Sequence, residues 1–298
     1  MRPKPGIFFL FAAMAITGLP LPARAQLLDV HPRGTEAKMH ILAFFPGAKD
    51  AGELILFDDA GHRLMARMLP FRLRAACIAS DGGFAAAPNT GGLLYLDGNM
   101  HVKMHIPGYA YETLVCTSDA VYAAGRTTRI HRFEFPGLLD RRKVAEANSF
   151  VPRMMAAGNM LAAISWDGSA ILLRENAPPL RVYTGTRSLI GLARGPQNSW
   201  ILLAENSRIS VIGPAGAENA RFHAESARML AASEQGILAV LDTDNKIRFY
   251  HRVAPYWLLM RRTLQLPEAV TPTAMAHVSG KRWVVLTPSG LVFFEEPR

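Results

Sequence analysis

Residues whose types could support catalysis are scattered along the chain. Glutamates stand at the ends of alternating apolar segments, namely Glu134, Glu175, Glu205, Glu295 and Glu296. A glycosidase needs two carboxylates at a defined separation, and the spacing of these residues brings no two of them together. The sequence also contains no HExxH, GxSxG, P-loop or dinucleotide-binding motif. We therefore assign no catalytic residue and no cofactor.

Soft metal ligands gather in one short stretch, at Met100, His101, Met104 and His105. By type they would suit copper. On a strand, however, residues 101 and 105 share one face and residues 100 and 104 the other, so the four cannot converge without a bend. Methionine is also a common core residue. The sequence predicts no metal site here.

Two polar runs could be mistaken for ligand sites. Asp242, Asp244 and Asn245 have the types of calcium ligands, and Trp166-Asp167-Gly168 has a faint likeness to the Asp-box turn of sialidase-like proteins. Both runs lie between alternating apolar segments, where Asp, Asn and Gly are typical turn residues. We interpret both as hairpin turns.

One stretch, from Val253 to Pro272, has the composition of an interaction surface. It contains Tyr256, Trp257, Met260, Arg261 and Arg262. These side-chain types are enriched where proteins bind each other. The alternative is an outer strand whose aromatic side chains pack down on the rest of the domain.

A second candidate binding surface is basic. It consists of Arg126, Arg129, Arg132, Arg141, Arg142 and Lys143. Such a cluster can form a positive rim that meets an anionic partner. The alternative is an ordinary solvated face.

A short pattern recurs along the chain: a turn, then Leu or Ile, then an alternating apolar strand. The anchoring residues are Leu54, Leu93, Ile130, Ile171, Ile209, Ile247 and Leu291. Subtracting neighbouring numbers gives spacings of 39, 37, 41, 38, 38 and 44 residues. A period near forty made of strands is typical of a β-propeller. We predict an all-β, seven-bladed propeller over residues 26–298, with six or eight blades as alternatives.

Each unit is expected to contain an inner strand rich in small residues, a second strand, a polar turn and a third strand. A more variable outer strand follows. Two residues beyond each anchor the side chain is apolar except at Arg132, where we expect a bulge or an exposed edge. The seventh unit stops after its third strand, and residues 26–38 are expected to supply the missing strand and so close the ring.

The repeating units resemble WD40-like and YVTN-type propellers, for example in the run RMLAASEQGILAVLDTDNKIRFYHR from Arg228 to Arg252. The Trp-Asp pair expected at the end of a third strand is absent, and Phe57-Asp58, Leu96-Asp97 and Tyr250-His251 stand there instead. The resemblance implies a scaffold that most often binds proteins and less often carries chemistry. Fold alone does not settle function.

The first 25 residues have the features of a cleavable signal peptide. Arg2 and Lys4 precede an apolar run that is too short to span a bilayer, and Ala23-Arg24-Ala25 follows as a cleavage site. We expect a periplasmic or secreted protein with no transmembrane anchor after cleavage. Removing residues 1–25 lowers the formal charge from +9 to +6, because Arg2, Lys4 and Arg24 are lost. A modestly basic exported protein could meet an anionic polymer, whereas nucleic acid is excluded by location.

The two cysteines, Cys77 and Cys116, occupy matching places in consecutive units. An oxidising compartment permits a disulfide between them. The alternative is two small buried side chains. The sequence leaves both alternatives open.

These observations lead to one functional prediction. We expect an exported, non-enzymatic propeller that acts as a protein-interaction scaffold in the bacterial cell envelope. The alternatives are a propeller that binds a small ligand or a polysaccharide, and an enzyme of the lyase or glycosidase kind that uses the axial pocket. A pocket rich in His, Tyr and carboxylates would favour an enzyme, and one lined by apolar residues would favour a scaffold.

Overall fold

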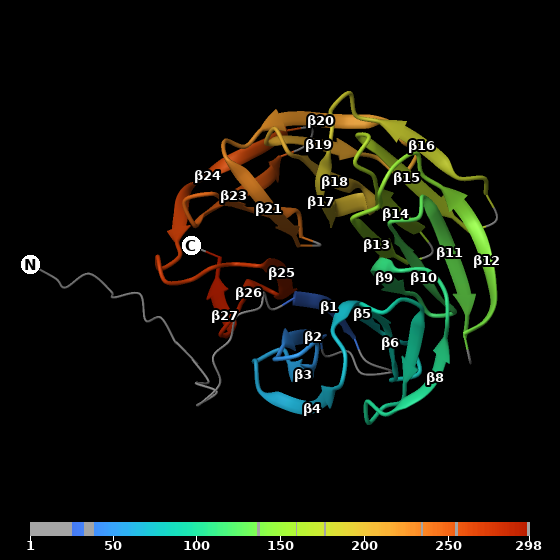
Figure 1. Ribbon diagram of the computed structural model, residues 1–298. Helices are drawn as coiled ribbons and strands as arrows, with labels where there is room; N and C mark the ends of the chain where they lie inside the picture. Colours follow the sequence, from blue (N-terminus) through green and yellow to red (C-terminus); the bar gives the residue numbers. More distant parts are fainter. Residues whose placement is uncertain are drawn as a thin grey trace, which may run out of the picture.

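The computed structural model describes residues 26–32, 39–135, 138–158, 160–175, 177–233, 235–253 and 256–296. They form seven antiparallel sheets arranged as blades around a central axis (Figure 1). The prediction of an all-β, seven-bladed propeller is confirmed. The signal peptide predicted for residues 1–25 lies outside the described residues.

Blades one to three each contain four strands, and every strand pairs with the next one along the chain. Blade one comprises β1 (Gln26–Pro32), β2 (Met39–Pro46), β3 (Gly52–Asp58) and β4 (Arg63–Leu69). Blade two comprises β5 (Leu73–Ile78), β6 (Phe84–Pro88), β7 (Leu93–Leu96) and β8 (Val102–Ile106). Blade three comprises β9 (Tyr111–Cys116), β10 (Ala120–Gly125), β11 (Arg129–Glu134) and β12 (Leu139–Glu146).

Blades four to six repeat this plan, and blade seven stops at three strands. Blade four comprises β13 (Arg153–Ala157), β14 (Met160–Ile164), β15 (Ser169–Arg174) and β16 (Leu180–Tyr183). Blade five comprises β17 (Leu189–Arg194), β18 (Trp200–Ala204), β19 (Arg208–Ile212) and β20 (Glu218–His223), with the short 3-10 helix η1 (Pro196–Asn198) between β17 and β18. Blade six comprises β21 (Ala227–Ala232), β22 (Ile237–Asp242), β23 (Lys246–Val253) and β24 (Tyr256–Gln265). Blade seven comprises β25 (Ala274–Ser279), β26 (Arg282–Thr287) and β27 (Gly290–Glu295).

Aspartates at the ends of strands hold several of the tight turns. Asp97 Oδ1 accepts hydrogen bonds from the N–H groups of Asn99 and His101, both at 2.9 Å. Asp58 and Asp242 accept equivalent pairs of backbone hydrogen bonds. Because a carboxylate that satisfies two backbone donors fixes the chain reversal, the interpretation of the Asp242 run as a turn is confirmed.

The hydrophobic core is divided among the seams between neighbouring blades. At the seam between blades one and two, Phe44 and Leu56 pack with Ile78 and Phe84 in one buried cluster. Comparable clusters fill the other six seams. This division explains why the third strands are apolar on both faces: each face meets a different neighbouring blade.

The predicted closure of the ring is wrong. Instead of completing blade seven, β1 pairs with β2, from Gln26 opposite Phe44 to Pro32 opposite Met39, and so becomes the inner strand of blade one. The ring is closed by packing instead, since Ile41 and Phe57 of blade one share a cluster with Val284 of blade seven. A hydrogen bond of 3.0 Å from Arg282 Nη1 to the Asp59 carbonyl also crosses this seam. The first unit begins with an inner strand as the others do, and this leaves no strand over for blade seven.

Arg132 interrupts the apolar column because the sheet is irregular around it. The pairing of β11 with β12 shifts between Ile130 and His131 and again between Arg132 and Glu134. The Arg132 guanidinium forms ion pairs with Asp119 and Glu134. The predicted bulge is therefore present, and the buried charge is paired.

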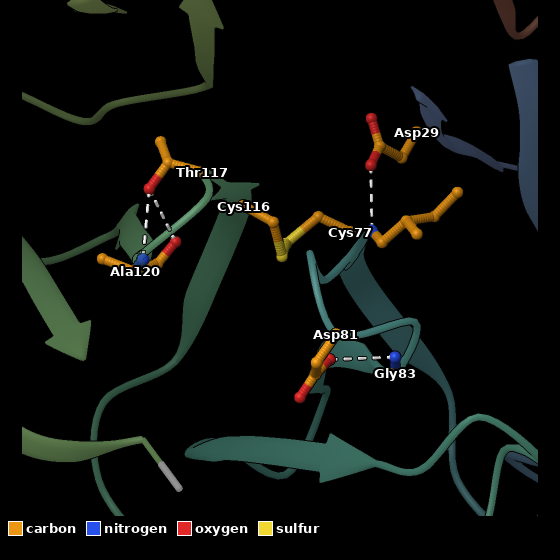
Figure 2. The surroundings of a disulfide bond; sticks show 8 residues. Asp29, Cys77, Asp81, Gly83, Cys116, Thr117 and Ala120 are labelled. Carbon is orange, nitrogen blue, oxygen red and sulfur yellow. Dashed lines mark hydrogen bonds between the residues drawn. A yellow bond between two sulfur atoms is a disulfide. The ribbon is translucent and has the colours of Figure 1, made fainter. Parts of the chain in front are cut away.

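A disulfide links two inner strands. Cys77 of β5 and Cys116 of β9 are bridged, with their Cα atoms 5.6 Å apart (Figure 2). On the other side of Cys77, Asp29 Oδ2 of β1 accepts a hydrogen bond of 2.9 Å from the N–H group of Ile78. The inner strands of blades one, two and three are therefore joined directly to one another.

Candidate interaction surface

One face of the ring consists of the loops that lead from each blade to the next and of the turns between second and third strands. We call it the interblade-loop face. Backbone hydrogen bonds tie its parts together around blade four. The N–H group of Trp166 donates to the Phe150 carbonyl at 3.1 Å, and the N–H group of Ser188 donates to the Trp166 carbonyl at 2.9 Å. Trp166 is therefore held between the loop before its blade and the loop after it.

The turn of blade four presents an exposed tryptophan. Trp166 is 53% exposed, and its ring stands edge-on to Phe150 with centroids 4.6 Å apart. Asp167 Oδ1 accepts hydrogen bonds from the N–H and hydroxyl groups of Ser169 at 3.0 and 2.6 Å. Partial burial alone would raise the pKa of Asp167, but these hydrogen bonds outweigh it and the pKa is lowered. The interpretation of this run as a turn is confirmed, and the turn holds an aromatic ring towards solvent.

Gly168 is required at this turn. Its φ is +84°, and a Cβ atom there would lie 1.6 Å from the carbonyl oxygen of Thr186. The Thr184 hydroxyl also donates a hydrogen bond of 2.9 Å to the Gly168 carbonyl. The turn and the following interblade loop are thus in direct backbone contact.

A second exposed aromatic side chain lies beside the first. Tyr183 ends β16 directly opposite Ser169 and is 64% exposed. Its hydroxyl accepts a hydrogen bond of 3.3 Å from Asn148 Nδ2 and faces Arg181 Nη1 at 3.5 Å. The hydrogen bond with Arg181, and then that with Asn148, lowers the pKa of Tyr183. Trp166 and Tyr183 are the large aromatic side chains that stay exposed among the described residues.

An open hollow of about 430 Å³ adjoins this turn. It is lined by Gly185, Thr186, Arg187, Glu205 and Asn206. The N–H group of Glu205 donates to the Ser188 carbonyl at 2.9 Å, so the hollow lies between the turns of blades four and five. Tyrosine, tryptophan, phenylalanine and arginine are enriched where proteins bind each other. We call Phe150, Trp166, Arg181, Tyr183 and Arg187 the blade-four patch.

The members of the predicted basic cluster all lie in blade three. Arg126 lies in the turn after β10, and its Nε donates to Glu112 Oε1 at 3.0 Å. Arg142 Nη2 lies 3.4 Å from Glu134 Oε1. Arg129 is exposed at the start of β11. Glutamates therefore offset two of these charges. Arg129, together with Arg141 and Lys143 of β12, lies close enough to His131 for its positive charge to lower the pKa of that residue.

Arg141, another member of the basic cluster, covers an aromatic cluster that the sequence did not reveal. Its guanidinium carbon lies 5.4 Å from the centre of the Tyr109 ring, and that ring stacks on His131 with centroids 5.2 Å apart. His131 Nδ1 lies 3.2 Å from the Tyr111 hydroxyl. Burial first, and then the charges of Arg141, Arg129 and Lys143, lowers the pKa of His131. Burial also raises the pKa of Tyr111 to about 12. Both shifts favour the uncharged forms of His131 and Tyr111.

The predicted patch around residue 257 proves to be the long outer strand of blade six. Trp257 is only 9% exposed and packs in a buried cluster with Ile209 and Tyr250. The strand bulges, because Phe249 alone stands opposite three residues, 260–262. The side chains of Tyr256, Met260, Arg261 and Arg262 lie outside the described part of the structure. Trp257 is therefore a core residue, as the alternative interpretation held.

One small cavity of the axial channel lies among the inner strands of blades four to seven. A cavity of about 20 Å³ is bordered by Arg153, Ile190, Gly191, Leu192, Arg228, Met229, Leu230, Ala274 and Met275. Arg153 Nε donates to the Ile190 carbonyl at 3.2 Å, and the surrounding protein lowers the pKa of Arg153. Arg228 Nε donates to the Asp242 carbonyl at 3.0 Å. The residues that border this space include no carboxylate, and the space has room for about one water molecule.

The described residues contain no group of three or more His, Cys, Asp or Glu side chains able to hold a metal ion. None of the described segments forms an apolar helix of membrane-spanning length.

No protein-family model and no curated protein sequence matches the chain. Solved structures match it over most of its length. A chain in the crystal structure of the mitotic checkpoint complex aligns with a TM-score of 0.73 at 11% identity, covering 99% of this chain and 98% of that one. The structure of BBS1N in complex with ARL6DN aligns with a TM-score of 0.71 at 14% identity, covering 98% of this chain and 97% of that one. The structure of U3-55K aligns with a TM-score of 0.68 at 12% identity, covering 90% of this chain and 92% of that one. The chain has a WD40-like propeller fold. At these identities the likeness concerns the fold alone.

The Trp-Asp pair that a resemblance to WD40-like propellers would place at the end of third strands is absent from blades one and two. In blades one and two, Phe57-Asp58 and Leu96-Asp97 stand at that place, and each aspartate accepts hydrogen bonds from the turn that follows. The aspartate thus keeps a structural role although its tryptophan neighbour is absent.

Proposed function

We propose that this propeller is an exported, non-enzymatic docking protein of the bacterial cell envelope. It binds a protein partner through the blade-four patch. The observation that carries the proposal is the exposure of two aromatic side chains of blade four, Trp166 at 53% in the turn before β15 and Tyr183 at 64% at the end of β16, near a hollow of about 430 Å³. Large aromatic residues next to arginine are the side chains that most often dominate the energy of protein interfaces.

The axial channel supports a scaffold rather than an enzyme. Its border consists of two arginines, glycine and apolar side chains, which supply neither the paired carboxylates of a glycosidase nor a general base. The alternative that these arginines favour is an anionic ligand at the axis. Arg228 is already engaged by the Asp242 carbonyl and by Asn245 Oδ1, so Arg153 would bear most of that interaction.

Two of the similar structures are themselves parts of protein assemblies: the mitotic checkpoint complex, and BBS1N in complex with ARL6DN. They support a partner of the same general class, a protein. Location in the envelope rests on the basic, apolar and A-x-A segments of residues 1–25.

Site-directed photo-crosslinking in intact cells tests the docking surface. A benzophenone side chain at position 183 is expected to give one dominant cross-linked protein. The same group at position 68 on β4 is the matched control, because Met68 is 60% exposed but lies on blade one. Trp166→Ala should reduce the yield at position 183 about tenfold or more, as for an interface anchor. Equal yields at both positions, or none at position 183, would rule out this surface.

The proposed location is tested by mass spectrometry of the protein recovered from the periplasmic fraction. An N-terminus at Gln26 is expected. Recovery of the uncleaved chain from the cytoplasm would overturn the envelope assignment without affecting the docking surface.

A further inference from the structure

Blade seven is one strand short. Among the described residues the other six blades have four strands each, whereas blade seven ends with β27 (Figure 1). In all six complete blades the fourth strand runs antiparallel to the third. No described strand pairs with the outer edge of β27.

The missing strand leaves apolar side chains half covered. The central residues of other third strands are buried, as in Leu54–Phe57 of β3 and Ile209–Ile212 of β19. In β27, Leu291, Val292 and Phe293 remain partly exposed, and only Phe294 is buried. A strand edge that offers both unpaired backbone and apolar side chains is a template for a further strand.

The electrostatics of the complete blades indicate what the further strand should carry. In blade one, Glu53 of the third strand meets Arg63 of the fourth at 2.5 Å. In blade three, Glu134 of the third strand meets Arg142 of the fourth at 3.4 Å. Glu295 ends the third strand of blade seven and is exposed. Counted from the anchors Ile130 and Leu291, Glu295 holds the place of Glu134, so a basic residue on an added strand would repeat the pairing of blade three.

We infer that the outer edge of β27 binds an extended segment of a partner protein by strand addition. The segment runs antiparallel to β27, alternates apolar residues with solvent-facing ones, and places an arginine or lysine beside Glu295. Main-chain hydrogen bonds then give affinity, and the side chains give specificity. The inference rests on the docking role proposed above, but it concerns a different blade and a different kind of contact.

Charge distinguishes this occupant from a second copy of the chain. If two β27 strands paired antiparallel, Glu295 of each would lie near Gly290 of the other, whose neighbours Pro288 and Ser289 carry no charge. The second β27 would therefore bring no basic residue to Glu295, whose cross-strand neighbour within its own blade is Arg282 of β26. The chain's own stretch 33–38 is tied at both ends, to β1 and β2, and residues 1–25 are predicted to be removed.

The chain's own sequence supplies a probe. A synthetic peptide of residues 62–70, HRLMARMLP, contains β4, the outer strand of blade one. Aligning anchors Leu54 and Leu291 makes Phe294 the counterpart of Phe57, which pairs with Arg63. The peptide arginine at position 63 would therefore lie next to Glu295.

Two peptides methylated on backbone nitrogens provide the sharpest control. One is methylated at alternate residues on the edge that faces β27, and the other at the residues between them. Because an N-methyl group removes a hydrogen-bond donor and blocks close approach, one set should weaken binding about tenfold or more. The other set should leave the fluorescence-anisotropy titration unchanged. This comparison leaves the protein itself unaltered.

A charge swap tests the pairing at Glu295. Glu295→Arg should weaken binding of the native peptide several-fold at low salt, and a peptide with Arg63→Glu should recover it. Glu268→Arg is the matched control, because Glu268 is also exposed and lies in the segment before β25.

The expected result is binding by one methylated peptide and not the other. Amide exchange should slow at residues 290–295 only when peptide is added, in a complex of one chain and one peptide. Absence of binding, or equal loss from both methylated sets, would overturn the inference. The inference would also be overturned if amide exchange at residues 290–295 were already slow before peptide was added, whether in a dimer or in a chain that retains residues 1–25. If the peptide fails to bind β27, the cross-linking result at position 183 is unaffected. If the cross-linking at position 183 fails, the peptide-binding result is likewise unaffected.

Discussion

Cys77 and Cys116 covalently join the inner strands of blades two and three, across 39 residues of sequence. In chain-entropy terms, closing a loop of this length restricts the unfolded chain by about 4 kcal/mol at 25 °C, and measured effects are commonly smaller. We expect the double change Cys77→Ala, Cys116→Ala to lower the free energy of unfolding by about 2–4 kcal/mol.

Denaturant unfolding with and without reductant checks this value. The wild type should become less stable on reduction, and the double variant should not respond. A wild type with two titratable thiols, or a variant of unchanged stability, would contradict the expectation.

Gly168→Ala should destabilise the blade-four turn. The position has φ +84°, and the added Cβ would overlap the Thr186 carbonyl, so we expect a loss of about 2 kcal/mol or more in the free energy of unfolding. Gly280→Ala is the matched control: φ is +53° there, but no atom lies within 4 Å of the added Cβ. It should cost only about 1 kcal/mol, the conformational part. Equal losses in the free energy of unfolding for the two variants would show that overlap with the Thr186 carbonyl adds nothing to the cost at Gly168.

Asp97 should contribute to the free energy of unfolding by an amount that depends on pH. Hydrogen bonds from the backbone of His101, with Lys103 and Asn99, lower the pKa of Asp97 to about 2 from the model-peptide value of 3.8. Because the folded-state pKa is the lower one, the contribution is present above about pH 4 and is lost as the pH falls towards 2.

Thermal unfolding of Asp97→Asn against wild type tests this window. The difference in melting temperature should be largest at neutral pH and should shrink between pH 4 and 2. A difference that stays constant through acid would refute the assignment.

His131 should titrate below its ordinary range, and Arg141 should be part of the reason. Burial comes first and the positive charges of Arg141, Arg129 and Lys143 follow. Since the folded-state pKa is lowered, His131 contributes stability that is present above about pH 6.5 and is lost as the pH falls through the folded value.

The ring-proton NMR shift of His131 reports its midpoint. Arg141→Ala should raise the midpoint, because a nearby positive charge is removed. Arg142→Ala is the control, since Arg142 pairs with Glu134 instead, and the midpoint should stay where it is. A larger shift of the His131 midpoint in Arg142→Ala than in Arg141→Ala would contradict the role given to the Arg141 charge.

Sequence reasoning succeeded where the pattern was periodic. The seven anchors from Leu54 to Leu291 are spaced by one blade each, because every third strand must be apolar on both faces to meet two neighbours. Closure was mispredicted because residues 26–32 precede the first anchor pattern, and nothing local distinguishes an inner strand of blade one from an outer strand of blade seven. Only the pairing of β1 with β2 shows that residues 26–32 belong to blade one.

The exposed aromatic residues were harder to predict because composition does not reveal exposure. Trp257 has the type of an interface anchor but packs beside Tyr250, while Trp166 was correctly placed in a turn without any sign that its ring faces solvent. The stack of Tyr109 on His131 joins residues from an interblade loop and a third strand. Their proximity depends on the ring geometry, and no local motif encodes it.

The packed seam between blades seven and one has a consequence for folding kinetics. Most contacts form between strands that are close in sequence, whereas the Arg282–Asp59 hydrogen bond spans 223 residues. Contacts across such a separation incur the largest loop-closure entropy and are expected to form late. This seam has no shared strand, and the disulfide lies elsewhere, between blades two and three. The ring should therefore complete its assembly at this seam, and under force or denaturant it should open there first.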